Sequence, residues 1–176
     1  MADTAVLERE ASCRLLLLRH GIAEEPSTDQ PAEQADAARP LTAAGRRRTR
    51  AVLQRLVQRQ LLCDRLFSSP LLRAWQTAEL AVATELAPAI ELAEPLAPGG
   101  DALAWLARLA ALHPLAGQTI ALVGHEPDLG GLAAALIGAR PGSLQLKKAG
   151  VAVLQWWPDQ PAARLQLLLT PKLLLP

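Results

Sequence analysis

Residues 15–21 read Leu15-Leu16-Leu17-Leu18-Arg19-His20-Gly21, an apolar run that ends in a cation, an imidazole and a glycine. A short apolar run of this kind is typical of a buried strand, although periodicity alone leaves a helix open. Gly21 and the acidic stretch after it favour a strand followed by a loop. That order predicts Arg19 and His20 at the carboxyl end of a central strand, where open α/β sheets bind their ligands.

A second apolar run ends in the same way at residues 120–127. His125 follows a predicted strand and precedes the start of a predicted helix at Glu126. We therefore expect His20 and His125 to meet across one anion pocket. The third histidine, His113, lies late in a predicted helix and is interpreted as structural.

Composition narrows the class of protein. The chain has 176 residues, of which 51% are hydrophobic, and a net charge of +1, so no bulk charge attracts it to nucleic acid or membranes. Residues 1–12 lack the apolar core of a signal peptide and are predicted to be a flexible leader to a single domain over residues 13–176. No apolar run approaches the ~20 residues of a membrane span. We expect a cytoplasmic monomer.

Strands alternate with helices along the chain. Predicted strands lie at about residues 14–18, 64–68, 90–92 and 119–123, with helices starting near residues 42, 69, 101 and 126. Residues 150–157 and 163–170 form a predicted antiparallel pair, and residues 22–40 are expected to be a long surface loop. This alternation predicts an α/β fold, a three-layer αβα sandwich around a mostly parallel central sheet.

Some local signals give sharper expectations. Ser69 is expected to cap the helix after the second strand, with Pro70 at its first position and Trp75 anchoring its apolar face. Cys13 and Cys63 each lie at or just before a predicted strand and could be sheet neighbours, but we interpret them as buried thiols. The arginines of the helix from Thr42 are interpreted as a solvated face in preference to a nucleic-acid patch.

The chemistry-bearing residues indicate a phosphate site. Arg19 and Arg73 lie on different elements that point to one crevice, and guanidinium groups match phosphate oxygens in paired hydrogen bonds. Positive neighbours lower the pKa of an imidazole, and a neutral imidazole has a lone pair that can attack phosphorus. The histidines lack metal-ligand spacing, and Arg19 would repel a cation, so we expect neither metal nor cofactor.

Four motifs occur in one order along the chain. They are Leu18-Arg19-His20-Gly21, Arg39-Pro40-Leu41-Thr42, Ser68-Ser69-Pro70-Leu71-Leu72-Arg73-Ala74-Trp75-Gln76-Thr77-Ala78, and Gly124-His125-Glu126-Pro127. Together they resemble the signature of the histidine phosphatase superfamily, which has a phosphoglycerate mutase-like fold. The short length and residues 98–101 are most similar to the SixA-type phosphohistidine phosphatases within it.

The resemblance implies a role for each matching residue. His20 would be the nucleophile and would be transiently phosphorylated, while Arg19 and Arg73 would hold the phosphoryl oxygens. His125 would hydrogen-bond the same oxygens, and Arg39 would be a secondary phosphate-binding residue. The expected substrate is a phosphohistidine-bearing protein, such as a phosphotransfer domain.

This sequence also departs from larger relatives. They carry an insertion between the helix of the Arg73 motif and the strand of the second histidine, and the stretch 74–124 is too short to hold one. We therefore expect an open pocket without a roof. Glu94 and Asp101 are possible general acids, and Glu24, Glu25 or Glu126 could also approach the site.

Two alternatives stay open at this point. One is a small-molecule phosphomonoesterase of the same superfamily, and the other is a catalytically silent module that binds phosphoproteins. Dependence of turnover on one carboxylate would distinguish ester hydrolysis from phosphohistidine hydrolysis, because an imidazole leaving group has a pKa near ~6.5 and needs little protonation. A mutase is disfavoured, because a roof to retain a sugar phosphate is missing.

Overall fold

A computed structural model describes residues 12–160 and 163–175 of the chain. The predicted leader therefore lies outside the described residues, apart from Ser12, which is buried and whose carbonyl accepts a hydrogen bond from Gly117 N–H. The helices and strands follow in this order: β1 (Cys13–Arg19), α2 (Ala32–Ala37), α3 (Ala43–Gln58), β2 (Arg65–Ser68), α4 (Leu72–Ala83), β3 (Glu91–Leu92), η1 (Glu94–Leu96), α5 (Ala102–Leu112), β4 (Thr119–Gly124), α6 (Asp128–Leu136), β5 (Val151–Trp156), β6 (Arg164–Leu169) and α7 (Pro171–Leu174).

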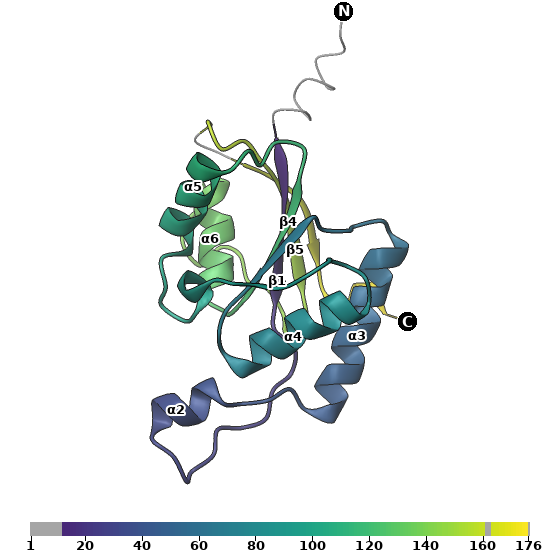
Figure 1. Cartoon of the computed structure of the whole chain (residues 1–176), viewed down its shortest axis with the longest axis vertical. Helices are drawn as coiled ribbons and strands as arrows, with labels where there is room; N and C mark the ends of the chain where they lie inside the picture. Colours follow the sequence, from purple (N-terminus) through teal and green to yellow (C-terminus); the bar gives the residue numbers. More distant parts are fainter. Residues whose placement is uncertain (1–11, 161–162, 176) are drawn as a thin grey trace, which may run out of the picture.

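The six strands form one sheet in the order β3-β2-β4-β1-β5-β6. β1 pairs in parallel with β4, and β2 pairs in parallel with both β4 and β3. β5 is antiparallel to β1 and to β6, as expected for the terminal pair. Helices α5 and α6 cover one face, while α3 and α4 cover the other (Figure 1). The predicted three-layer α/β sandwich with a mostly parallel sheet is confirmed.

The leucine run of β1 divides between two cores because strand side chains alternate in direction. Leu15 and Leu17 pack in the cluster beneath α5 and α6, whereas Leu16 and Leu18 pack in the cluster beneath α3 and α4. All four are fully buried. A strand covered on both faces has no solvent-facing positions, which explains why the run is continuously apolar.

Two local predictions for α4 are wrong. The helix begins at Leu72 with Leu71 as its N-cap residue, so Ser69 and Pro70 precede it, and Ser69 Oγ accepts a 3.3 Å hydrogen bond from Leu71 N–H. Trp75 is only partly buried. Besides Arg73 and Leu80, the buried residues of α4 are small: Ala74, Thr77, Ala78 and Ala81.

The cysteines are not sheet neighbours. β4 lies between β1, which carries Cys13, and β2, which Cys63 precedes, and the two residues pack in clusters on opposite faces. Both thiols are free and buried, and burial raises the pKa of each to about 12.

None of the helices within the described ranges is long and apolar enough to cross a bilayer.

Candidate active site

The site begins where β1 and β4 end side by side. Arg19 is in register with Gly124, and His20 N–H donates to Gly124 O at 3.1 Å. The residues that follow these partners on the two strands are His20 and His125, so the parallel register brings both imidazoles to the same edge. Their ring centroids are 5.1 Å apart. The structure therefore brings together the two histidines that the sequence placed at strand ends.

Gly21 follows the end of β1 and forms a hydrogen bond with α4. A Cβ at this position would overlap Thr49 Oγ1, so only glycine fits against α3 here. Gly21 N–H donates to Thr77 Oγ1 at 3.1 Å, and the Thr77 hydroxyl donates to Arg73 O at 2.8 Å. The strand that carries His20 and the helix that carries Arg73 are thus held together by one buried hydroxyl.

His20 is a neutral imidazole with one nitrogen free to accept a bond. Its Nδ1 lies 2.7 Å from Gly21 O, and because a carbonyl only accepts, Nδ1 carries the ring proton and Nε2 keeps the lone pair. The pKa of His20 is lowered to about 4, mainly by burial and also by the nearby charges of Arg73 and Arg19, against the opposing effect of the Gly21 bond. At neutral pH the Nε2 lone pair is therefore unprotonated.

His125 is buried near the same arginines, Arg73 and Arg19. Burial lowers its pKa to about 3, with His20 and Arg73 as the next contributors. Its Nε2 lies 2.8 Å from Ser69 Oγ. Its Nδ1 is also buried and has no hydrogen-bond partner among the described residues.

Arg19 is held by the loop before β5. Its Nη1 donates to Leu146 O at 2.8 Å, and Leu146 N–H donates to Glu126 Oε1 at 2.9 Å. Burial lowers the pKa of Arg19, with Glu126 acting in the opposite direction. Within residues 12–160 and 163–175, Arg19 Nε has no partner.

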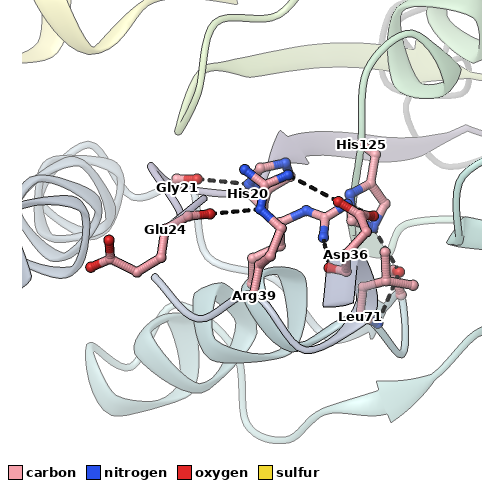
Figure 2. A network of polar contacts seen from close by, with 9 residues as sticks. His20, Gly21, Glu24, Asp36, Arg39, Leu71 and His125 are labelled. Carbon is pink, nitrogen blue, oxygen red and sulfur yellow. Dashed lines mark hydrogen bonds and ion pairs between the residues drawn. The ribbon is translucent and has the colours of Figure 1, made fainter. Parts of the chain in front are cut away.

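Asp36 is a site residue that the sequence analysis missed. Arg73 donates to it twice, from Nη1 to Asp36 O at 2.6 Å and from Nη2 to Asp36 Oδ2 at 3.0 Å. Arg39 Nη1 donates to Asp36 Oδ1 at 2.9 Å, and Arg39 Nε donates to Glu24 O at 2.6 Å. Figure 2 shows Asp36 and Arg39 gathered beside His20 and His125. One carboxylate thus bridges both arginines.

These partners favour the ionised form of Asp36. Burial acts to raise the pKa of Asp36, but the hydrogen bonds and charges of Arg39 and Arg73 outweigh it, and the net shift is downward. The available sequence signal was the spacing of two opposite charges three residues apart, with Asp36 in α2 and Arg39 just beyond its end. The expectation of a plain loop over residues 22–40 hid it, because that stretch contains α2.

The side chains of this site are largely buried. His20, Arg73 and His125 are only 7%, 5% and 2% exposed. No insertion precedes β4, as predicted. The segment that carries α2, between β1 and α3, instead places Asp36 on Arg73. A short helix inside the expected loop thus brings a carboxylate to the arginines of this site.

The predicted general acids lie outside this cluster of hydrogen bonds. Asp101 is exposed, and its Oδ1 accepts from Ala104 N–H as the cap of α5. Glu94 is exposed on η1, which packs against the end of β4 through Leu96 O. Glu126 is occupied by Leu146 N–H. The side chains of Glu24 and Glu25 are exposed.

Metal ligands are not clustered in the described part of the chain, where no three His, Cys, Asp or Glu side chains gather closely enough to hold an ion. The polar groups at this edge are mainly imidazole and guanidinium donors, a set that suits an oxyanion. Two facing imidazoles and three arginines at the carboxyl edge of a parallel sheet thus define an anion-binding site in an α/β sandwich.

Comparison with known proteins identifies the family. Residues 15–96 match the histidine phosphatase superfamily (branch 1). The fold also matches the protein histidine phosphatase SixA complexed with tungstate, with a TM-score of 0.76, 25% identity, and coverage of 90% of this chain and 97% of that chain. The chain belongs to the histidine phosphatase superfamily, and it is a phosphatase of that superfamily.

Two further relatives extend this likeness. An uncharacterised protein of Picosynechococcus sp. is 42% identical over 171 residues, which cover 92% of this chain and 99% of the relative. A mycobacterial glucosyl-3-phosphoglycerate phosphatase shares the fold, with a TM-score of 0.67, 22% identity, and coverage of 90% and 99% of the two chains.

Proposed function

We propose that this phosphatase removes the phosphoryl group from a phosphohistidine side chain of a protein, through a covalent intermediate on His20. The observation that carries the proposal is the state of His20. Its Nδ1–H is held by Gly21 O, its Nε2 lone pair is unprotonated at neutral pH, and a second imidazole lies 5.1 Å away between centroids. This is the arrangement that an uncharged nitrogen nucleophile needs.

The reaction proceeds in two transfers. His20 Nε2 attacks phosphorus, the bond between phosphorus and the substrate imidazole nitrogen breaks, and that nitrogen takes the electron pair and then a proton from water. The hydroxide that this proton transfer leaves then attacks the phosphoryl group on His20; the bond from phosphorus to Nε2 breaks, which releases hydrogen phosphate and returns the electron pair to the neutral imidazole. Arg19 and Arg73 stabilise the negative charge on the phosphoryl oxygens in both steps, Arg39 adds positive charge, and His125 donates a hydrogen bond.

The state of the carboxylates supports a phosphohistidine substrate. An alkoxide leaving group needs a proton from a positioned acid, whereas an imidazole leaving group needs it far less. Asp36 lies in the site, but Arg39 and Arg73 hold its pKa low, which makes it a poor proton donor at neutral pH. Asp101 caps α5, and Glu94 is exposed. The likeness to SixA, a protein histidine phosphatase, points the same way.

A small phosphoester is the second candidate substrate. The burial of His20 and His125 favours it, because a small ligand reaches buried imidazoles more readily than a side chain of another protein does. The fold shared with the mycobacterial sugar-phosphate enzyme is compatible with either substrate. A silent binding module is disfavoured, because the nucleophile and the arginines around it are all present.

The test is an assay of the purified protein against phosphohistidine-bearing proteins and small phosphoesters, paired with trapping of the phosphoenzyme. We expect release of phosphate from phosphohistidine and an acid-labile, base-stable label on the wild-type protein. His20→Ala should lose both. His113→Ala is the matched control, because His113 is exposed at the end of α5 and outside the site.

Each alternative has its own result. Label and turnover with phosphoesters alone would replace the substrate but keep the nucleophile. Turnover that persists in His20→Ala would overturn the nucleophile. Binding of phosphoprotein without turnover or label would favour the silent module.

A further inference from the structure

The hydrogen bonds around Ser69 determine which nitrogen of His125 carries the proton. Ser69 is fully buried between the end of β2 and the start of α4. Its Oγ accepts from Leu71 N–H at 3.3 Å and lies 2.8 Å from His125 Nε2. Within the described residues, Ser69 Oγ has no third partner.

The hydroxyl proton of Ser69 has one acceptor within reach. Leu71 N–H is a donor and cannot accept it, so the proton points to His125 Nε2. The reverse arrangement, with Nε2–H donating to Ser69, would leave the hydroxyl proton buried without an acceptor, which costs free energy. Nε2 is therefore the acceptor, and a neutral His125 carries its proton on Nδ1.

Nδ1 is also the ring nitrogen that is left for a ligand. It is buried, unpaired within the described residues, and belongs to a ring that is 2% exposed. The His125 ring lies 5.1 Å from that of His20 between centroids, and Arg73, Asp36 and Arg19 are the other groups close enough to act on its charge. A proton on Nδ1 is a donor there, whereas a lone pair on Nδ1 would repel a phosphoryl oxygen.

We propose that Ser69 is a positioning residue: it fixes His125 in the Nδ1–H tautomer, so that this atom donates to the phosphoryl group. The proposal rests on the proposed function for its ligand, but the tautomer itself is a property of the free protein. Ser69 touches no substrate in this account and acts only through His125.

The test reads the tautomer directly. In protein labelled with ¹⁵N at histidine, long-range proton–nitrogen correlation spectra separate a protonated from an unprotonated ring nitrogen. We expect wild-type His125 to show Nδ1 protonated and Nε2 unprotonated at pH 7, and tungstate to perturb Nδ1 more than Nε2. A His125→Gln variant assigns the signals among the three histidines.

Two serine variants separate tautomer control from folding. Ser69→Ala removes the donor to Nε2, and we expect His125 to shift toward the Nε2–H tautomer and tungstate affinity to fall about tenfold. Ser68→Ala is the matched control, because Ser68 is equally buried but donates to Ser69 O and not to His125. It should keep the wild-type tautomer and affinity, and Ser69→Thr, which retains the hydroxyl, should restore both.

Several results would overturn the proposal. Wild-type His125 with its proton on Nε2 would do so, even if Ser69→Ala failed to fold. An Nδ1–H signal that persists in Ser69→Ala would show that Ser69 does not control the tautomer. Failure of the proposed function looks different, because the tautomers would follow this pattern while no phosphorylated substrate turned over.

Discussion

Asp36 occupies the arginine groups that a phosphoryl group needs, and Asp36→Asn tests that competition. Its carbonyl and carboxylate oxygens take one N–H from each Nη atom of Arg73, and the carboxylate also binds Arg39 Nη1. A phosphoryl group that takes the same two N–H groups of Arg73 must displace Asp36. Asparagine keeps the shape of the side chain but removes its negative charge, so it should compete less strongly.

The magnitude follows from the exposure of the carboxylate. Charged hydrogen bonds contribute about 1.5–3 kcal/mol when well shielded, and exposed ion pairs about 0–1 kcal/mol. The Asp36 side chain is 41% exposed, whereas that of Arg73 is 6% exposed, so the pair lies near the weaker limit. Removing the charge should therefore release about 1 kcal/mol to phosphate binding, which is about a fivefold tighter Kd.

The assay is calorimetric titration with tungstate or phosphate at low ionic strength. Asp29→Asn is the matched control, because Asp29 is exposed on the same segment and its carboxylate accepts a hydrogen bond from the nearby Ser27 hydroxyl. It should leave the Kd unchanged. Weaker oxyanion binding in Asp36→Asn would refute the competition and would mean that Asp36 instead holds the arginines in their binding geometry.

Two further predictions concern Arg73 and pH. Arg73→Lys should weaken tungstate binding about 10- to 100-fold, because lysine cannot make the paired contact. The free energy of unfolding should change far less. Arg65→Lys, which loses the paired contact with Glu91 on β3, is the control and should bind tungstate normally. Equal losses in both variants would contradict the role of Arg73. The folded-state pKa values of His20 and His125, about 4 and about 3, lie below the ordinary 6.5, so the unfolded chain takes up protons first as pH falls. The free energy of unfolding should therefore decline from pH 6.5 toward pH 4, by up to ~1.4 kcal/mol per pH unit for each proton. Measured by urea unfolding, His125→Gln should show a shallower decline. An equal slope in both proteins would refute this linkage.

The sequence alone determined the sheet and the two histidines at its edge. Apolar runs that stop at Arg19-His20 and at Gly124-His125 define strand ends locally, and parallel strands must end at the same edge, so the meeting of His20 and His125 followed from pattern. The Thr42 and Asp101 caps were likewise readable, because a cap bonds to a backbone N–H three residues ahead.

Tertiary structure alone decided which groups contact the arginines and histidines of the site. Asp36 reaches Arg73 across 37 residues, and Ser69 reaches His125 across 56. Such contacts depend on how irregular segments fold back over the sheet, and no period in the sequence encodes that path. The small buried residues of α4 were not predicted either. Hydrophobicity selects Trp75 as the anchor, whereas the positions that pack inward are mainly alanine. Local pattern therefore fixed which residues reach the edge, while long-range packing fixed what each one touches there.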